Sequence, residues 1–305
     1  MKFERAYCEE LNRVITPYIA RELYFNEDSQ FYGKKLSFLC EDKECRKTLI
    51  AVGIYLQKRT KRALHFRSKD ALEHTCYENN IIGGHEGKKI GNDDPFKVTK
   101  YPTELILDPP KSGNPKVGGV DIDDDEGNKP SKTSNSIGSG SEIKETRYRI
   151  RSFEHLIDCY LNGDKKVLEA MEFTINGKTK KFYSFFKKIN YYLDEKGLVY
   201  YGEVSGIKKY GENYKIYFKD KAWVENAYRT VSIYIDKELI NKFGKRKIFK
   251  EQLEDLSNVD DKKAICYFVG VYPEVIEYEF NKNKKKSAQV TIKDLRHLVL
   301  TYDEI

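Results

Sequence analysis

Four residues in the first third of the chain have the chemistry and the spacing of a zinc site. Cys40 and Cys45 form a C-x4-C pair in FLCEDKECRKTLI, and His74 and Cys76 form an H-x-C pair in LEHTCYEN. Thiolates and imidazoles are the ligands that tetrahedral Zn2+ prefers, and a metal held by two close pairs ties two short loops together. His65 is an alternative fourth ligand. We therefore predict a single structural zinc; a reduced, buried pair of thiols with a surface histidine is the alternative.

A basic segment lies between the two pairs. Lys58, Arg59, Lys61 and Arg62 place four positive charges within five residues. Such crowding is unfavourable without a counter-charge. A phosphate backbone supplies one, so we expect Arg59, Lys61 and Arg62 to contact nucleic acid. The alternative is a solvated hairpin tip.

Residues 38–76 resemble the zinc-binding N-terminal region of competence protein CoiA-like families. The resemblance rests on the Cys40–Cys45 pair, the basic segment, the His65-Phe66 pair and the closing His-Thr-Cys. It implies a structural zinc in a module that handles DNA. In that family the module commonly precedes a nuclease domain with an E-x-K arrangement. This chain offers no matching set, so nuclease activity is not inferred, and a zinc-containing nuclease subunit with atypical acidic residues stays an alternative.

Lysine and tyrosine alternate in the second half of the chain. Lys215, Tyr217 and Lys219 occupy every second position of NYKIYFK, and Tyr234 lies in VSIYID. Alternate side chains share one face of a strand, so the intervening apolar residues would fill a core and the Lys-Tyr-Lys set would face outward. Aromatic rings stack on bases and lysines follow phosphates. The pattern predicts binding of single-stranded DNA or RNA; the alternative is a set of exposed strand residues in a lysine-rich protein.

The order of the expected elements around these residues is that of an oligonucleotide-binding (OB) barrel. We expect strands at 199–207, 213–219 and 230–236, a helix at 245–256, a strand at 264–271 and further strands near 289–292 or 297–302. Three meandering strands, a helix and two or more strands is the OB order. Other small barrels share it.

A polar segment divides the chain. Residues 109–144 are rich in Gly, Ser, Pro, Asn and Asp and contain no aromatic residue, so they cannot bury enough apolar surface to order themselves. We expect a flexible linker at 109–144 between a zinc-binding module at 1–108 and an OB-like domain with preceding helices at 145–305. The expected fold class is α+β. In the first module, 50–55 and 64–66 read as paired strands, and 6–23 reads as a helix or as a strand and a helix divided at Pro17.

The overall composition narrows the function classes. The chain has 305 residues, with 55 Lys and Arg against 48 Asp and Glu, and the net charge of +7 falls mostly in 145–305. No apolar stretch reaches the length of a membrane helix and the start does not resemble a leader, so we expect a cytoplasmic protein with no membrane partner. Gly-rich phosphate loops, nucleophile elbows and H-E-x-x-H are absent from the sequence, which favours binding over catalysis.

Taken together, the sequence predicts a non-catalytic nucleic-acid-binding protein with a structural zinc. Its ligand would be single-stranded DNA or RNA, or a junction. Its setting would be DNA uptake, repair or defence against foreign DNA. A protein-interaction adaptor in a nucleic-acid-processing or antiviral complex is the alternative from a different class, with a partner chain in place of the nucleic acid.

Overall fold

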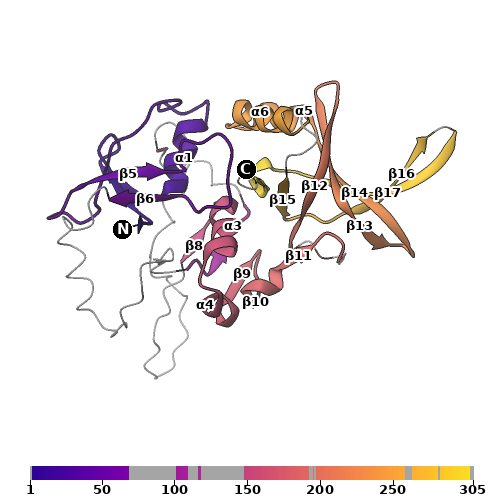
Figure 1. Cartoon of the computed structure of the whole chain (residues 1–305), viewed down its shortest axis with the longest axis horizontal. Helices are drawn as coiled ribbons and strands as arrows, with labels where there is room; N and C mark the ends of the chain where they lie inside the picture. The colour runs from indigo at the N-terminus through magenta and orange to yellow at the C-terminus, as the bar shows by residue number, and fades with distance from the viewer. Residues whose placement is uncertain are drawn as a thin grey trace, which may run out of the picture.

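The computed structural model of the chain describes residues 2–68, 101–108, 116–117, 148–191, 195, 197–257, 263–280 and 282–302. Over these ranges the fold is mixed α+β and rich in strands, with five α-helices, as the sequence predicts at that coarse level. An N-terminal sheet lies at one end of the molecule and a large curved sheet at the other, with a small sheet and helices between them (Figure 1). Within the described residues, no helix has the combined length and apolar character needed to cross a bilayer.

The N-terminal part of the fold consists of a sheet of six short strands and one helix. Its strands are β1 (Lys2–Phe3), β2 (Ala6–Cys8), β3 (Arg13–Ile15), β4 (Phe38–Leu39), β5 (Thr48–Val52) and β6 (His65–Ser68), in the order β1-β6-β5-β4-β2-β3. Helix α1 (Pro17–Phe25) starts where the side chain of Thr16 accepts a hydrogen bond from the backbone N–H of Ile19. Proline suits the first helical position because its missing N–H has no partner there. The segment is therefore divided at Pro17, one of the two expected arrangements.

A four-stranded sheet in the middle joins segments from both sides of the expected linker. It comprises β7 (Glu104–Leu105), β8 (Arg149–Ile150), β9 (Glu172–Ile175) and β10 (Lys178–Lys181), in the order β10-β9-β7-β8. Strand β7 runs parallel to β8 and to β9. Residues 101–108, assigned from sequence to the first module, thus pair with the second. Of the expected linker, only 116–117 lies among the described residues, and Val117 is buried in the N-terminal core.

Two helices and a short 3-10 turn accompany this middle sheet. They are α3 (Phe153–Asn162), α4 (Lys165–Ala170) and η2 (Phe182–Phe185). Ser152 caps α3, because its side chain accepts a hydrogen bond from the backbone N–H of His155. The β9–β10 turn at Asn176-Gly177 has φ of 51° and 76°, the left-handed conformation that an Asn-Gly hairpin requires.

The large sheet shares the second core of the molecule with the middle sheet and α3. Its elements are β11 (Phe186–Lys188), β12 (Val199–Tyr210), β13 (Asn213–Val224), β14 (Ala227–Ile235), α5 (Lys237–Lys242), α6 (Arg246–Ser257), β15 (Ala264–Val269), β16 (Glu274–Phe280), β17 (Asn283–Thr291), η3 (Leu295–His297) and β18 (Leu298–Tyr302). The strand order is β16-β17-β14-β13-β12-β15-β18, with β11 on β12. Strands β14 and β17 are parallel, whereas β12 and β15 are antiparallel.

The sheet curves because its long strands are irregular at defined points. Register shifts interrupt the β12–β13 and β13–β14 pairings, and such bulges bend and twist a strand. Gly270, with φ of 84°, lies between β15 and β16. The chain therefore leaves β15, which pairs with β12, and turns into β16, which pairs with β17.

The N-terminal sheet is attached to the rest of the protein through buried charges. Asp158 of α3 is 2% exposed and forms an ion pair with the guanidinium of Arg59. Its carboxylate also accepts the Tyr18 hydroxyl at 2.7 Å and the Leu64 backbone N–H at 3.2 Å. A buried carboxylate is tolerated when several donors satisfy it. The pairing of Arg59 with Asp158 therefore connects residues from opposite sides of the expected linker.

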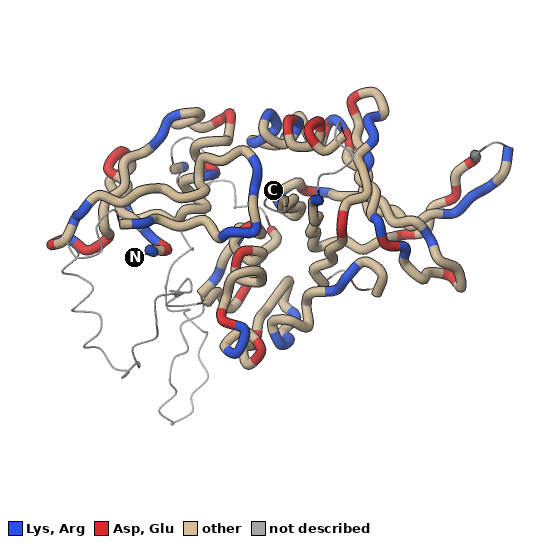
Figure 2. The backbone as a smooth tube through the Cα atoms, viewed as in Figure 1, with Lys and Arg blue, Asp and Glu red and all other residues tan. Residues whose placement is uncertain are grey.

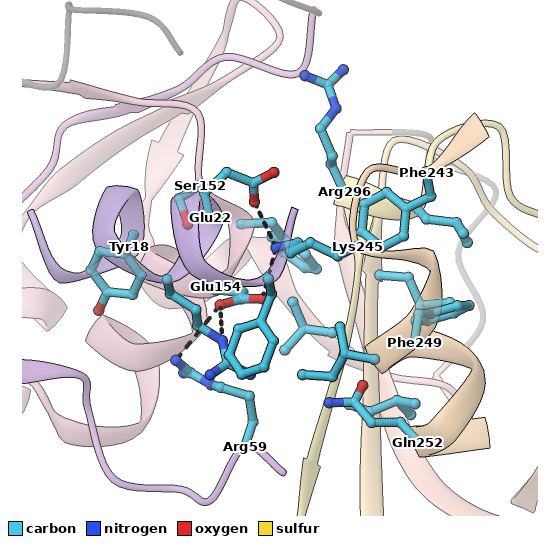
Figure 3. Close-up of a pocket in the computed structure, with 18 of the residues that line it drawn as sticks. Tyr18, Glu22, Arg59, Ser152, Glu154, Phe243, Lys245, Phe249, Gln252 and Arg296 are labelled. Carbon is cyan, nitrogen blue, oxygen red and sulfur yellow. Dashed lines mark hydrogen bonds and ion pairs between the residues drawn. The ribbon is translucent and has the colours of Figure 1, made fainter. Parts of the chain in front are cut away.

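A second carboxylate extends this cluster into a cavity of about 160 Å³ (Figure 3). Glu154 lies 3.5 Å from Nε of Arg21, 3.4 Å from Nζ of Lys245 and 3.7 Å from Nη1 of Arg59. Lys245 also pairs with Glu22 of α1 at 2.9 Å. The remaining walls of the cavity are largely aromatic and aliphatic. Each positive charge is thus matched by a carboxylate, and the cluster joins α1, α3 and the start of α6.

The basic segment belongs to this attachment, which corrects one sequence-based expectation. Arg59 is 3% exposed, and its carbonyl accepts the backbone N–H of Tyr302 at 2.8 Å. Lys58 pairs with Asp255 of α6 at 2.9 Å. The prediction that Arg59 contacts phosphate is wrong for this fold, because its guanidinium is already enclosed beside Asp158.

The two neighbouring cations of the segment lie closer to the surface. Lys61 is half-buried and Arg62 is exposed. The carbonyl of Lys61 accepts the Asn162 side-chain amide at 2.8 Å, so the backbone there also serves the contact between the two halves. A phosphate role for Lys61 and Arg62 stays a prediction.

The cluster makes the stability of the fold depend on pH. Burial by itself would raise the pKa of Glu154, but Lys245, Arg21 and Arg59 outweigh it and hold that pKa at about 2, below its ordinary value of 4.5. A lowered folded-state pKa means that the carboxylate stabilises the fold fully above pH 4.5 and loses this effect as the pH falls towards 2.

Glu154→Gln should lower the free energy of unfolding at pH 7 by about 3 kcal/mol. The variant should also show a smaller fall in the free energy of unfolding between pH 4.5 and 2. Chemical denaturation at a series of pH values measures this.

The matched control is Glu169→Gln, because Glu169 forms an exposed ion pair with Lys165. Exposed pairs contribute at most about 1 kcal/mol, so this variant should keep the wild-type pH profile. Equal pH profiles for wild type and Glu154→Gln would contradict the role given to Glu154.

Candidate nucleic-acid interface

Strand β13 separates its apolar and polar residues onto opposite faces. Tyr214, Ile216 and Phe218 are buried, whereas Lys215 and Tyr217 are only half-buried. The expected alternation is confirmed here, because the apolar set fills the core of the large sheet and leaves its neighbours outside.

Register places the outward residues of three strands side by side. Lys215 pairs with Lys208 of β12 on one side and with Tyr234 of β14 on the other. Directly opposed residues in an antiparallel pair have Cβ atoms about 5 Å apart. Lys215, Tyr217 and Tyr234, singled out from the sequence, are thus brought together.

We call the surface formed by five of these side chains the Lys–Tyr face: Lys208, Tyr210, Lys215, Tyr217 and Tyr234. The ammonium groups of Lys208 and Lys215 lie 5.8 and 5.6 Å from the centroid of the Tyr217 ring. The hydroxyls of Tyr210 and Tyr217 are 3.0 Å apart. The face therefore combines aromatic rings and positive charges within hydrogen-bonding and cation–π distance.

The electrostatics of this face favour an anionic ligand. Burial lowers the pKa of Lys215, because partial loss of water disfavours its charged form. Burial also raises the pKa of Tyr217, and the hydrogen bond with Tyr210 adds to this, so the phenol stays neutral at pH 7. A phosphate oxygen would restore to Lys215 the stabilisation that it loses with water.

One polar group beneath the face has no hydrogen-bond partner among the described residues. Ser232 pairs with Tyr217 across β13 and β14, and its side chain is 1% exposed. Its Oγ makes no hydrogen bond within the part of the chain that is described. An unpaired buried hydroxyl is unfavourable by about 1–3 kcal/mol, a cost that a bound water would offset.

Positive charge around the face is less extensive than the sequence suggests. Lys219 pairs with Glu203 at 3.1 Å, which compensates much of its charge. The lysine-rich strand β17 faces glutamates on β16, with Lys286 opposite Glu277 and Lys284 opposite Glu279. Figure 2 shows lysines along one strand of this outer hairpin and acidic residues along the other. Among the described residues of the face, Lys208 and Lys215 form no ion pair.

Lys208 and Tyr210 are members of the face that the sequence analysis missed. The first strand was expected to end at Ile207, whereas β12 continues to Tyr210 and pairs with Asn213. The signal was present as alternation, since Gly206, Lys208 and Tyr210 occupy the polar positions of one continuous strand.

Two of the predicted zinc ligands bracket a single turn. Cys40 follows β4 and its backbone N–H donates to the carbonyl of Lys47 at 2.8 Å. The backbone N–H of Cys45 donates to Oδ1 of Asp42 at 3.1 Å. Cys40 is buried and Cys45 half-buried. The turn therefore presents two thiols from one short loop, an arrangement whose donor chemistry fits zinc.

The other predicted ligands are not brought to this turn by the described residues. His65 lies in β6, is buried, and has Nδ1 3.0 Å from the carbonyl of Ala63. Burial lowers its pKa, which keeps the imidazole neutral. His74 and Cys76 lie outside the described residues. Within those residues, no group of three or more His, Cys, Asp or Glu side chains is placed to hold a metal ion.

Comparisons with known proteins supply little. No family model matches the chain, and no curated protein matches it. One similar solved structure is a chain described as a putative aspartyl-tRNA synthetase from Leishmania major Friedlin, with 10% sequence identity and a TM-score of 0.24. The match covers 39% of this chain and 21% of that chain. A likeness at this level supports no argument about fold or function, so the interface has to be argued from its own residues.

Proposed function

We propose that the protein binds single-stranded nucleic acid through the Lys–Tyr face. The observation that carries the proposal is that the ammonium groups of Lys208 and Lys215 lie 5.8 and 5.6 Å from the centroid of the Tyr217 ring, with Tyr234 opposite Lys215. Rings that accept a stacked base next to cations that accept a phosphate are the two components of strand binding without base-specific contacts. DNA uptake, repair or defence against foreign DNA is the setting that the CoiA-like resemblance suggests.

The topology of the large sheet supports an OB-like reading of this domain. Strand β12 pairs with β13 and, in the antiparallel sense, with β15, while β14 pairs in parallel with β17. Helices α5 and α6 lie between the third strand and the fourth. We propose that β12, β13, β14, β15–β16 and β17 are the five strands of such a barrel. The Lys–Tyr face then spans its first three strands, of which the second and third commonly bind oligonucleotides in OB folds.

We also propose that Cys40 and Cys45 hold a structural zinc ion together with His74 and Cys76, with His65 as an alternative fourth ligand. The support is the turn that places both thiols at the ends of one loop. A metal there would stabilise an N-terminal sheet whose strands are only two to five residues long.

Removing a ring from the face should weaken binding. Tyr217→Ala or Tyr234→Ala should each raise the Kd for a labelled oligothymidylate by about tenfold, because a stacked base contributes about 1–3 kcal/mol. Fluorescence anisotropy at low salt measures this. Tyr191→Ala is the control, since Tyr191 is exposed but lies outside the face. Unchanged affinity in both face variants, or no binding of single-stranded DNA or RNA by the wild type, would contradict the proposal.

Removing a cation should change the salt dependence as well as the affinity. Lys215→Ala should reduce the slope of log K against log salt by about 0.7, the value for one phosphate contact on a single strand. The same anisotropy titrations at several salt concentrations give this slope. Lys165→Ala, in an exposed ion pair on α4, should leave it unchanged. Equal slopes for wild type and Lys215→Ala would show that this lysine contacts no phosphate.

The zinc proposal has a separate test. Metal analysis of the purified chain should give about one zinc per protein, and Cys40→Ser and Cys45→Ser should each abolish it. Cys266→Ser, in the buried strand β15, is the control and should retain the metal. Zinc content that is negligible in the wild type, or unaffected by replacing Cys40 and Cys45, would contradict the site.

A further inference from the structure

The β13–β14 hairpin presents the one tryptophan of the chain to solvent. Trp223 is 52% exposed and its cross-strand neighbour Tyr228 is 71% exposed. Their rings meet edge to face, with centroids 4.9 Å apart. Large aromatic side chains are enriched at binding sites, and a rigid exposed pair of them is an unusual feature on a surface that meets only water.

The tip that carries this pair is held in place. The turn residues Glu225 and Asn226 have φ of 49° and 57°, the conformation of a tight hairpin turn. Arg229 donates from Nε to the carbonyl of Val224 at 3.0 Å. The carboxylate of Glu225 lies 3.4 Å from Arg229 and 3.4 Å from Lys286 of β17. Two cations thus compensate the one acidic side chain of the turn and link the tip to the neighbouring hairpin.

Strand alternation places the tip on the same side of the sheet as the Lys–Tyr face. Tyr228 and Tyr234 are six positions apart on β14, an even number, so their side chains lie on the same face of the strand. On β13, Tyr217, Lys221 and Trp223 likewise share one face. Lys221 and Thr230 are both exposed. At about 3.3 Å per residue, the two aromatic groups lie roughly 20 Å apart along the strand, with a positive side chain between them.

We propose that Trp223 and Tyr228 form a second base-stacking position for the strand bound by the Lys–Tyr face. This inference rests on the proposed function and specifies its ligand. Two stacking positions separated by a lysine select a single strand long enough to reach both, at the lower end of the roughly 4–16 nucleotides that such barrels cover. Neither a dinucleotide nor a duplex, whose bases are already stacked on one another, meets both positions.

The fluorescence of Trp223 reports on this tip alone, because the chain contains no other tryptophan. An oligothymidylate of about ten nucleotides should quench its emission at the concentrations that saturate the anisotropy of the same labelled oligonucleotide. A dinucleotide should leave the emission unchanged. Trp223→Ala should weaken binding of the longer strand by about tenfold, and Trp223→Phe should recover most of it, since a phenyl ring still stacks.

The two readouts separate failure of the inference from failure of the proposed function. Anisotropy could show binding of the oligonucleotide while the Trp223 emission stays unchanged and Trp223→Ala keeps its affinity. That result would overturn the second stacking position and leave the Lys–Tyr face intact. Absence of any anisotropy change would overturn both. A loss of affinity in Trp223→Ala without quenching in the wild type would also contradict stacking and indicate a structural role, as would an equal loss in the control Tyr191→Ala. Quenching by a bound protein partner in place of the oligonucleotide would instead identify the tip as a protein-docking site.

Discussion

The alternation of side chains along β13 is the constraint that determines both faces of the large sheet. The strand pairs with β12 on one side and β14 on the other, so its register fixes the register of both neighbours. Burial of Tyr214, Ile216 and Phe218 leaves Lys215 and Tyr217 outside, since a slip of one residue would expose the core residues and bury the ammonium group of Lys215. The composition of the outer face is therefore a consequence of packing the inner one.

A different interaction determines how the N-terminal sheet is attached. Arg59, Arg21 and Lys245 are matched by Asp158, Glu154 and Glu22 in a largely buried cluster that draws its members from α1, α3, the basic segment and the start of α6. Removing one member would leave an uncompensated charge, which is strongly unfavourable. The cluster thus encloses Arg59, which the sequence alone suggests as a phosphate contact, in a buried ionic contact.

Much of the local structure could be predicted from sequence because it is set by neighbours along the chain. Alternation predicted strands where β13 and β14 lie, and Pro17 marked the point where residues 6–23 divide into a strand and a helix. The long-range pairings could not be predicted. Arg59 reads as a phosphate ligand until Asp158, about a hundred residues later in the chain, is seen beside it.

Two features of the structure escaped sequence reasoning because both depend on how strands pair. Trp223 and Tyr228 are adjacent only because β13 and β14 form one hairpin whose turn begins at Glu225, six residues beyond where the second strand was expected to end. Residues 101–108 join the middle sheet through parallel pairing with β8 and β9, which leaves no local pattern in the sequence.

Photo-crosslinking tests most directly whether a single strand of nucleic acid binds to the Lys–Tyr face. A single-stranded oligonucleotide irradiated in complex with the full chain, followed by mass spectrometry of the crosslinked peptides, locates the bound bases. We expect crosslinks at Tyr217 or Tyr234, within β13 and β14. Crosslinks confined to other parts of the chain, such as the basic segment at 57–62, would contradict binding at this face.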